Sequence, residues 1–247
     1  MNISREETFE AMRALLDPGD DVMVHASLAP LGHFEAGVES VIDAMLAAIG
    51  PRGTLLMMTD TRSFVQTGRF SLDQPSETGL LTERFRQRDG VLRSCVPMVS
   101  FCALGPNAGD YTLRYNSHLE EDAPLTRLLR NDGRILLLGV PYKKCTLYHL
   151  TEERHQSPSN IYKTFSGVLV EDGREVGPIS QRYFVRRDIN TRKSPAIVGQ
   201  MLEDRGLVRT AALGAGELRS FRARDFDACS MQAIAADPNV FLVDVPN

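Results

Sequence analysis

The segment that decides the fold is Arg134-Ile-Leu-Leu-Leu-Gly-Val-Pro-Tyr-Lys-Lys-Cys-Thr-Leu-Tyr-His-Leu-Thr-Glu152. Its first part, Arg134 to Gly139, is a short apolar run that predicts a buried strand. A short loop follows, and the later spacing predicts a helix that carries His149 and Glu152 three positions apart. Residues three apart share one face of a helix, so this carboxylate can orient the imidazole and support its charged form. A solvated helix face is the alternative for such a pair.

Strands and helices are expected to alternate on both sides of this segment. Apolar runs predict strands at 21–26, 54–59 and 135–140 and a strand pair within 91–105, with helices expected at 4–16, 40–48, 80–88, 124–130 and 145–154. The alternation predicts a layered α/β/α core with a mainly parallel or mixed sheet. From about residue 160, hairpin spacing around Glu171-Asp-Gly173 predicts an antiparallel C-terminal addition. We expect one domain over 1–247, with this addition as a small C-terminal lobe.

The composition is that of an ordinary globular protein, with 43% hydrophobic and 24% charged residues among 247. The net charge of −4 gives no electrostatic reason to expect nucleic acid as a partner. The four cysteines have no CxxC spacing, so neither a structural zinc site nor a disulfide framework is indicated. The N-terminal residues lack a secretory pattern, and no apolar run approaches the ~20 residues that span a bilayer. We therefore expect a cytoplasmic protein without a membrane partner.

Four motifs occur in order along the chain: Val22 to Ser27 with Leu31-Gly32 and a helix opening at Gly37, then Leu92 to Gly105, Ala123 to Leu128, and Gly139 to Glu152. Taken together, they resemble the aminoglycoside 3-N-acetyltransferases. The resemblance extends from about Val22 to Val208. It implies an acyltransferase that moves an acetyl group from acetyl-coenzyme A to an amine of an aminoglycoside antibiotic, which is an antibiotic-resistance activity. The implied partner is a small-molecule amine, and a homodimer is the candidate assembly.

Acetyl transfer to an amine requires removal of a proton from the ammonium, correct placement of the thioester and donors for the oxyanion. The resemblance assigns the role of general base to His149, which is intact here, and we expect Glu152 to orient it. The reaction is then a direct attack of the amine on the thioester.

The resemblance also implies residues on the coenzyme A side. His25 and Ser27 match the place of a family motif that lies at that site, and the neighbouring Leu31 and Gly32 carry over with them. The alternative for His25 is a strand-end histidine, and for Ser27 a cap. The other expected cofactor contacts, with capping or surface charge as their alternatives, are Arg93, Ser94, Ser100 and Thr146.

The acceptor is less closely specified than the donor. Aminoglycosides are polycations, so the carboxylates of Asp60, Glu77 and Asp122 are expected to face the acceptor, with a solvated surface role as the alternative. Val96 stands where the family commonly has a histidine, and the late segment 181–188 is basic. These departures favour two alternatives to aminoglycoside acetylation. One is an N-acyltransferase of another amine, for example in natural-product metabolism, and the other is a ligand-binding relative without turnover.

Two further interpretations of the helix involve its neighbouring residues. His149, Glu152 and His155 lie at i, i+3 and i+6, and over six residues a helix turns by ~600°, so the three fan out instead of converging on a metal. No metal is therefore expected. Cys145 lies four residues before His149 and could serve as a nucleophile in an acyl-enzyme route, although small buried cysteines are common.

Overall fold

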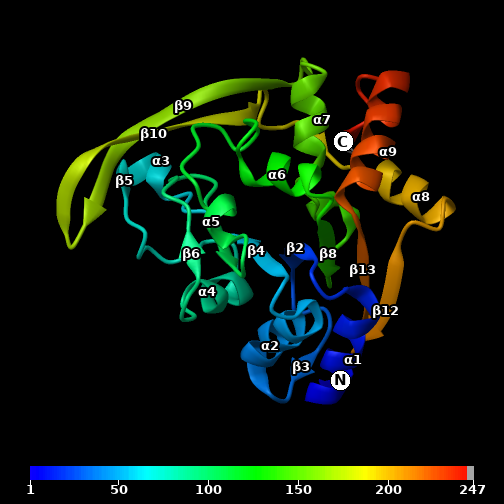
Figure 1. Cartoon of the computed structure of the whole chain (residues 1–247). Helices are drawn as coiled ribbons and strands as arrows, with labels where there is room; N and C mark the ends of the chain where they lie inside the picture. Colours follow the sequence, from blue (N-terminus) through cyan, green and yellow to red (C-terminus); the bar gives the residue numbers. More distant parts are fainter. Residues whose placement is uncertain (244–247) are drawn as a thin grey trace.

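A seven-stranded sheet forms the centre of the protein in a computed structural model, which describes residues 1–243 (Figure 1). The strands lie in the order β12-β13-β8-β2-β4-β7-β6. Their bounds are β2 (Asp21–Ala26), β4 (Thr54–Met58), β6 (Leu92–Arg93), β7 (Phe101–Leu104), β8 (Arg134–Leu138), β12 (Arg209–Leu213) and β13 (Gly216–Arg222).

The sheet is mixed. Strand β2 is parallel to both β4 and β8, whereas every other pair in this sheet is antiparallel. The late strands β12 and β13 join the sheet beside β8, so part of the C-terminal third completes the core. The predicted layered α/β core with a mixed sheet is confirmed, and a separate C-terminal lobe stays a prediction.

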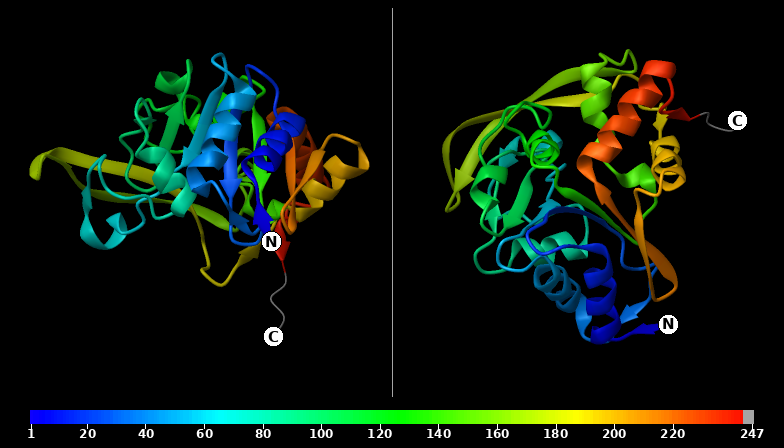
Figure 2. Two further views of the ribbon diagram at one scale, coloured as in Figure 1. Left: turned by 90° about the horizontal axis from the view of Figure 1, so that it is seen from below. Right: turned by 45° about the vertical axis from the view of Figure 1, so that its right-hand side comes forward.

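Helices cover both faces of the sheet (Figures 1 and 2). Along β2, Val22 and Val24 pack into one buried cluster and Met23 into another, as the alternation of side chains along a strand requires. The first cluster includes residues of α1 (Arg5–Leu15), α2 (Gly37–Ile49) and α4 (Leu80–Arg86). The second includes residues of α5 (Ala108–Tyr111), α6 (Pro124–Arg130), α7 (Tyr148–Arg154), α8 (Ala196–Asp204) and α9 (Ala223–Ala236).

A long hairpin lies outside this sheet, and one end of it projects beyond the body of the molecule (Figure 2, left). It consists of β9 (Asn160–Glu171) and β10 (Arg174–Arg186), with β5 (Arg69–Phe70) added parallel to β9. Asp172 and Gly173 at the turn both have positive φ, of 48° and 76°, which is typical of a tight two-residue hairpin. The predicted hairpin is confirmed, although Ser180 to Arg187, expected as a separate strand, belongs mostly to β10.

Several short elements complete the described chain. The start of α1 carries the Ser4 and Glu7 capping box that its sequence favours. The remaining elements are β1 (Asn2–Ile3), β3 (His33–Phe34), α3 (Phe64–Thr67), the 3₁₀ turn η1 (Tyr142–Lys144), β11 (Arg192–Lys193) and β14 (Leu242–Val243).

The three mutually parallel strands bring distant segments to one edge of the sheet. Strands β2, β4 and β8 end at Ala26, Met58 and Leu138, and their carboxyl ends share an edge because they run in the same direction. The segments that follow them contain Ser27, Asp60 and the loop leading to α7. Ligands in open α/β sheets bind at such an edge.

Candidate active site

Helix α7 presents the histidine that the sequence analysis singled out. The Nδ1 atom of His149 lies 2.8 Å from Oε2 of Glu152, so the two side chains meet on one helix face as their spacing predicts. Glu152 is 1% exposed, whereas the His149 side chain keeps 25% of its surface exposed. The pair thus joins a buried carboxylate to an imidazole that a ligand can reach.

A lysine from a distant segment completes this arrangement. The Lys193 ammonium, on β11, forms an ion pair with Oε1 of Glu152 and donates a hydrogen bond to the side-chain oxygen of Asn160. The Lys193 side chain is only 3% exposed. Because an ionised carboxylate only accepts hydrogen bonds, Glu152 requires His149 to carry its proton on Nδ1. The lone pair on Nε2 of His149 is then available to accept a proton.

The pKa values of Glu152 and Lys193 show which charges the site supports. Burial alone would raise the pKa of Glu152, but hydrogen bonds and charge from His149 and Lys193 bring it below the usual value. Burial lowers the pKa of Lys193, and the neighbouring Glu152 opposes that change. Glu152 is therefore the charged anchor of the group at neutral pH.

A cavity of about 940 Å³ opens beside His149. Tyr148 and His149 from α7 form part of its wall, with ring centroids 4.1 Å apart, and Lys193 reaches it from β11. The hairpin supplies another part, including Phe165 and Tyr183. A substrate in this cavity would lie directly against the exposed side of His149.

A second histidine belongs to the surroundings of His149 but was missed by the sequence analysis. His118 is 4% exposed, its ring centroid lies 5.1 Å from that of Tyr183, and its Nδ1 has no hydrogen-bond partner within residues 1–243. Burial, together with the nearby His149, lowers the pKa of His118 to about 3. This imidazole is therefore neutral. Nothing in the spacing of the sequence indicates His118, Tyr183, Asn160 or Lys193, because tertiary folding alone brings them to α7.

A second cavity, of about 520 Å³, lies beside the loop that follows β2. Ser27 and Gly32, two of the expected cofactor contacts, line it together with the first residues of α2 and α4. Gly32 has a φ of +134°, and a Cβ there would approach the Met1 carbonyl oxygen within 2.5 Å, so only glycine fits. Gly139 after β8 is equally confined, since a Cβ would lie 2.3 Å from the Ser27 carbonyl oxygen. Two of the family-like motifs therefore meet at this loop.

The other residues around that loop lie beneath the cavity surface. Leu31 is fully buried in the core. His25, near the end of β2, is partly buried, and its Nε2 is inaccessible and lacks a hydrogen-bond partner in the described part of the chain. Burial lowers the pKa of His25 to about 4. The Thr146 hydroxyl contacts the Met58 sulfur at 3.6 Å. Cofactor roles for His25, Leu31 and Thr146 stay predictions.

The expected phosphate contact Arg93 is engaged within the protein. Its guanidinium donates to the carbonyl oxygens of Thr59, Leu72 and Gln74 and to the hydroxyls of Thr61 and Ser100. These five contacts match the five N–H donors of an arginine. Arg93 thus fixes the segment after β4, and a phosphate would have to displace one of these contacts.

The two expected serine contacts belong to the same buried region. Ser100 donates to the Thr59 carbonyl at 2.6 Å, and the Ser94 hydroxyl accepts from the Phe101 amide at 2.9 Å. Both serines are fully buried. Any contribution they make to cofactor binding would be through the shape of the loop, and it stays a prediction.

The structure brings two of the three expected acceptor residues together through their backbones. The Glu77 amide donates to the Asp60 carbonyl at 2.9 Å, and Asp60 lies 3.4 Å from Arg62, which lines the larger cavity. Asp60 is 2% exposed, and burial raises its pKa to about 6 despite Arg62 and Arg93 nearby. Asp122 is separate, because it is exposed and pairs with Arg127 of α6.

The surroundings of Cys145 bear on the alternative of an acyl-enzyme route. Cys145 is fully buried, and burial raises the pKa of its thiol to about 12, which disfavours a thiolate nucleophile. Val96 is 1% exposed and packs in the core.

Within residues 1–243, no group of three or more His, Cys, Asp or Glu could hold a metal ion. None of the helices in that range is long and apolar enough to cross a membrane.

Comparison with solved structures gives the class of protein. The crystal structure of aminoglycoside acetyltransferase AAC(3)-Xa matches with a TM-score of 0.81, covers 94% of this chain and 93% of that one, and is 27% identical. A structure of AAC-IIIb with coenzyme A matches with a TM-score of 0.80 over 100% of both chains at 23% identity, which shows the shared fold. The chain has the fold of an acyltransferase.

Sequence comparison gives the family. A family model for aminoglycoside 3-N-acetyltransferase matches residues 23–235. Aminoglycoside N(3)-acetyltransferase VII of Streptomyces paromomycinus is 29% identical over 244 residues, covering 85% of this chain and 83% of that protein. Aminoglycoside N(3)-acetyltransferase III of a Salmonella species is 32% identical over 195 residues, covering 70% and 68%. The chain belongs to the aminoglycoside 3-N-acetyltransferase family, which confirms the predicted resemblance and enzyme class.

Proposed function

We propose that the protein transfers the acetyl group of acetyl-coenzyme A to a primary amine of a small molecule, with His149 as general base. The observation that carries this proposal is the group formed by His149, Glu152 and Lys193, of which His149 and Lys193 line a large cavity. Aminoglycosides are the acceptors for which the curated relatives are named, so they are the first amines to assay.

The chemistry follows from the atom that His149 leaves free. Nε2 takes the proton that the amine must lose, and the amine nitrogen bonds to the thioester carbonyl carbon. The carbon–sulfur bond then breaks, and the proton on His149 neutralises the departing coenzyme A thiolate. The buried Glu152 holds the imidazole and stabilises its charged form in between. The raised pKa of the Cys145 thiol favours this direct attack over an acyl-enzyme route.

The donor is proposed to bind beside the loop after β2. The cavity there is lined by Ser27, Gly32 and the beginning of the 13-residue helix α2. Backbone amides at a helix start point outward and favour anionic groups. The contact between Gly139 and the Ser27 carbonyl ties this loop to the segment that leads to α7, which places donor and base along the same edge of the sheet.

Release of free thiol from acetyl-coenzyme A, followed across a panel of amines, tests this function. Acetyl-coenzyme A should bind, and at least one class of amine should release thiol in step with an N-acetylated product detected by mass spectrometry. Binding without thiol release from any amine would identify a ligand-binding relative. Failure to bind acetyl-coenzyme A would overturn the proposal altogether.

A further inference from the structure

The cavity beside His149 has an unusual charge. Its wall contains six lysine and arginine residues but a single carboxylate, that of Asp188. The cations come from four separate parts of the chain, so they are gathered by the fold. They are Arg62, Lys143, Lys163, Arg186, Arg187 and Lys193.

Two of these cations have carboxylate partners. Lys193 is paired with Glu152, and Arg62 lies 3.4 Å from Asp60. Within residues 1–243, no carboxylate oxygen lies within 4.0 Å of the charged groups of the other four, which are Lys143, Lys163, Arg186 and Arg187. The cavity wall is therefore positive beyond what its own acidic groups balance.

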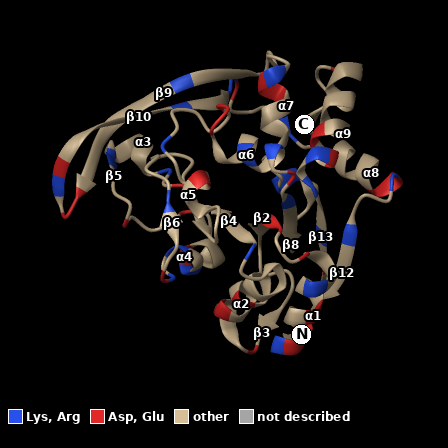
Figure 3. Ribbon diagram, viewed as in Figure 1, with Lys and Arg blue, Asp and Glu red and all other residues tan. Residues whose placement is uncertain are grey.

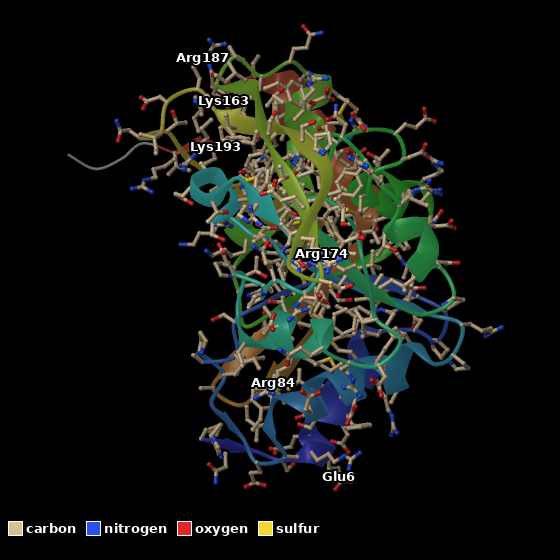
Figure 4. All side chains as sticks on the ribbon, turned by 90° about the vertical axis from the view of Figure 1, so that its left-hand side faces the viewer. Glu6, Arg84, Lys163, Arg174, Arg187 and Lys193 are labelled. Carbon is tan, nitrogen blue, oxygen red and sulfur yellow. The ribbon has the colours of Figure 1, made fainter. Side chains whose placement is uncertain are left out.

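The two arginines are held in place by backbone oxygens. Arg186 donates to the Thr191 carbonyl at 2.6 Å, and Arg187 donates to the Pro158 carbonyl at 3.0 Å. Lys163 lies directly across the hairpin from Tyr183. Figure 4 shows Lys163, Arg187 and Lys193 gathered at one end of the hairpin, with Arg174 apart from them. Acidic residues of the hairpin lie instead near its turn, at Glu171, Asp172 and Glu175 (Figure 3).

Such a cavity repels a polycation and attracts an anion. Arginine and lysine are the side chains that bind phosphate and carboxylate groups, through charge-assisted hydrogen bonds. Building on the proposed function, we infer that the acceptor is an amine that also carries an anionic oxygen group, of which phosphate is the best-matched class, and that Lys143, Lys163, Arg186 and Arg187 bind that group.

The phosphates of coenzyme A are the other anions that such a wall could bind. Two observations assign the cations to the acceptor. His149, which must touch the acceptor nitrogen, lines the cationic cavity. The cavity lined by Ser27 and Gly32 contains no lysine or arginine in its wall.

A matched pair of substrates tests the inference. Glucosamine and glucosamine 6-phosphate present the same amine, one without and one with the anion, and gentamicin represents the polycations. We expect kcat/KM for glucosamine 6-phosphate to exceed that for glucosamine by about 10- to 100-fold, as charge-assisted contacts to one phosphate allow. That advantage should shrink as salt is added, because ions screen the attraction.

A double variant, Lys143→Gln with Lys163→Gln, identifies the source of the anion. Both lysines are exposed, so the variant should fold. KM for glucosamine 6-phosphate should rise about tenfold or more, while KM for acetyl-coenzyme A stays unchanged. Lys144→Gln is the control, because Lys144 is exposed and adjacent to Lys143 but does not line the cavity.

Three results would overturn the inference. The first is equal or better turnover of glucosamine or gentamicin, which would leave the proposed acetyl transfer intact. The second is a rise in KM for acetyl-coenzyme A in the double variant, which would assign the lysines to the coenzyme phosphates. If no amine releases thiol, the proposed function fails instead, and calorimetry with glucosamine 6-phosphate then decides: no difference in binding between wild type and double variant would also overturn the anion site.

Discussion

Glu152 bonds His149 and Lys193 through different oxygens of one buried carboxylate. Its Oε2 lies 2.8 Å from Nδ1 of His149, and its Oε1 accepts from the Lys193 ammonium. Lys193 therefore sets how much of the carboxylate's negative charge His149 experiences. This relationship joins α7 to a strand about forty residues later in the chain, as β11 spans Arg192–Lys193.

Glu152→Gln should reduce kcat by about tenfold or more, because an amide cannot stabilise the protonated imidazole as a carboxylate does. Coenzyme A affinity should change little. Steady-state kinetics with the best amine measures the effect, and Glu153→Gln on the same helix is the matched control. Equal loss in the control would show that the helix was disturbed, and full activity of Glu152→Gln would remove the carboxylate from the mechanism.

Lys193→Met should move the acid limb of the kcat/KM profile to higher pH. Without the ammonium, the pKa of the buried Glu152 rises, so the charged carboxylate that holds His149 is lost at a higher pH. The profile is measured between pH 5.5 and 9. A purely structural role for Lys193 would lower the amount of active enzyme at every pH without displacing the limb.

The buried His118 should make stability depend on pH. Its pKa is lowered to about 3 in the folded protein, against about 6.5 in an unfolded chain, so only the unfolded state gains this proton as pH falls below 6.5. The free energy of unfolding then decreases by roughly 1.4 kcal/mol per pH unit from this group. His25, with a pKa lowered to about 4, adds to the loss, while Asp60, with a pKa raised to about 6, opposes it.

A comparison with His118→Asn isolates the contribution of His118, because the other groups are common to both proteins. The free energy of unfolding is measured with urea at pH 6.5, 6.0, 5.5 and 5.0. It should decrease less steeply for the variant than for the wild type, by about 1.4 kcal/mol per pH unit. Parallel declines would show that His118 is protonated equally in the two states.

Cys145→Ala should retain most of the activity if the amine attacks the thioester directly. The thiol is fully buried and its pKa is raised to about 12, so it is not ionised at neutral pH. Turnover is compared after correction for the folded fraction, because replacing the buried cysteine by alanine leaves a small cavity in the core that can lower stability. Abolished turnover in a folded variant, with an acetylated wild-type intermediate detected by mass spectrometry, would establish the acyl-enzyme route.

Local patterns predicted much of the fold. The capping box at Ser4, the Asp172-Gly173 turn and the run from Arg134 to Leu138 each determine structure through neighbouring residues. The order and direction of the strands could not be predicted in this way. The antiparallel pairing of β13 with β8, for example, depends on contacts between segments about eighty residues apart.

The site was predictable only where its residues are close in sequence. His149 and Glu152 share a helix turn, so their contact followed from spacing. Lys193 reaches Glu152 only through the tertiary fold, and no local pattern indicates it. For Arg93, the residue type alone was misleading. An arginine suggested a phosphate contact, but its N–H groups donate to backbone carbonyls from two segments of the chain.

In the proposed reaction, His149 removes the proton from the acceptor amine. Thiol release by His149→Ala, compared with His155→Ala, tests it directly, because His155 is an exposed histidine at the end of the same helix. We predict that His149→Ala lowers kcat by about 10²–10⁴ with unchanged acetyl-coenzyme A binding, whereas His155→Ala behaves as wild type. Equal turnover of the two variants would show that His149 is not the base that removes this proton.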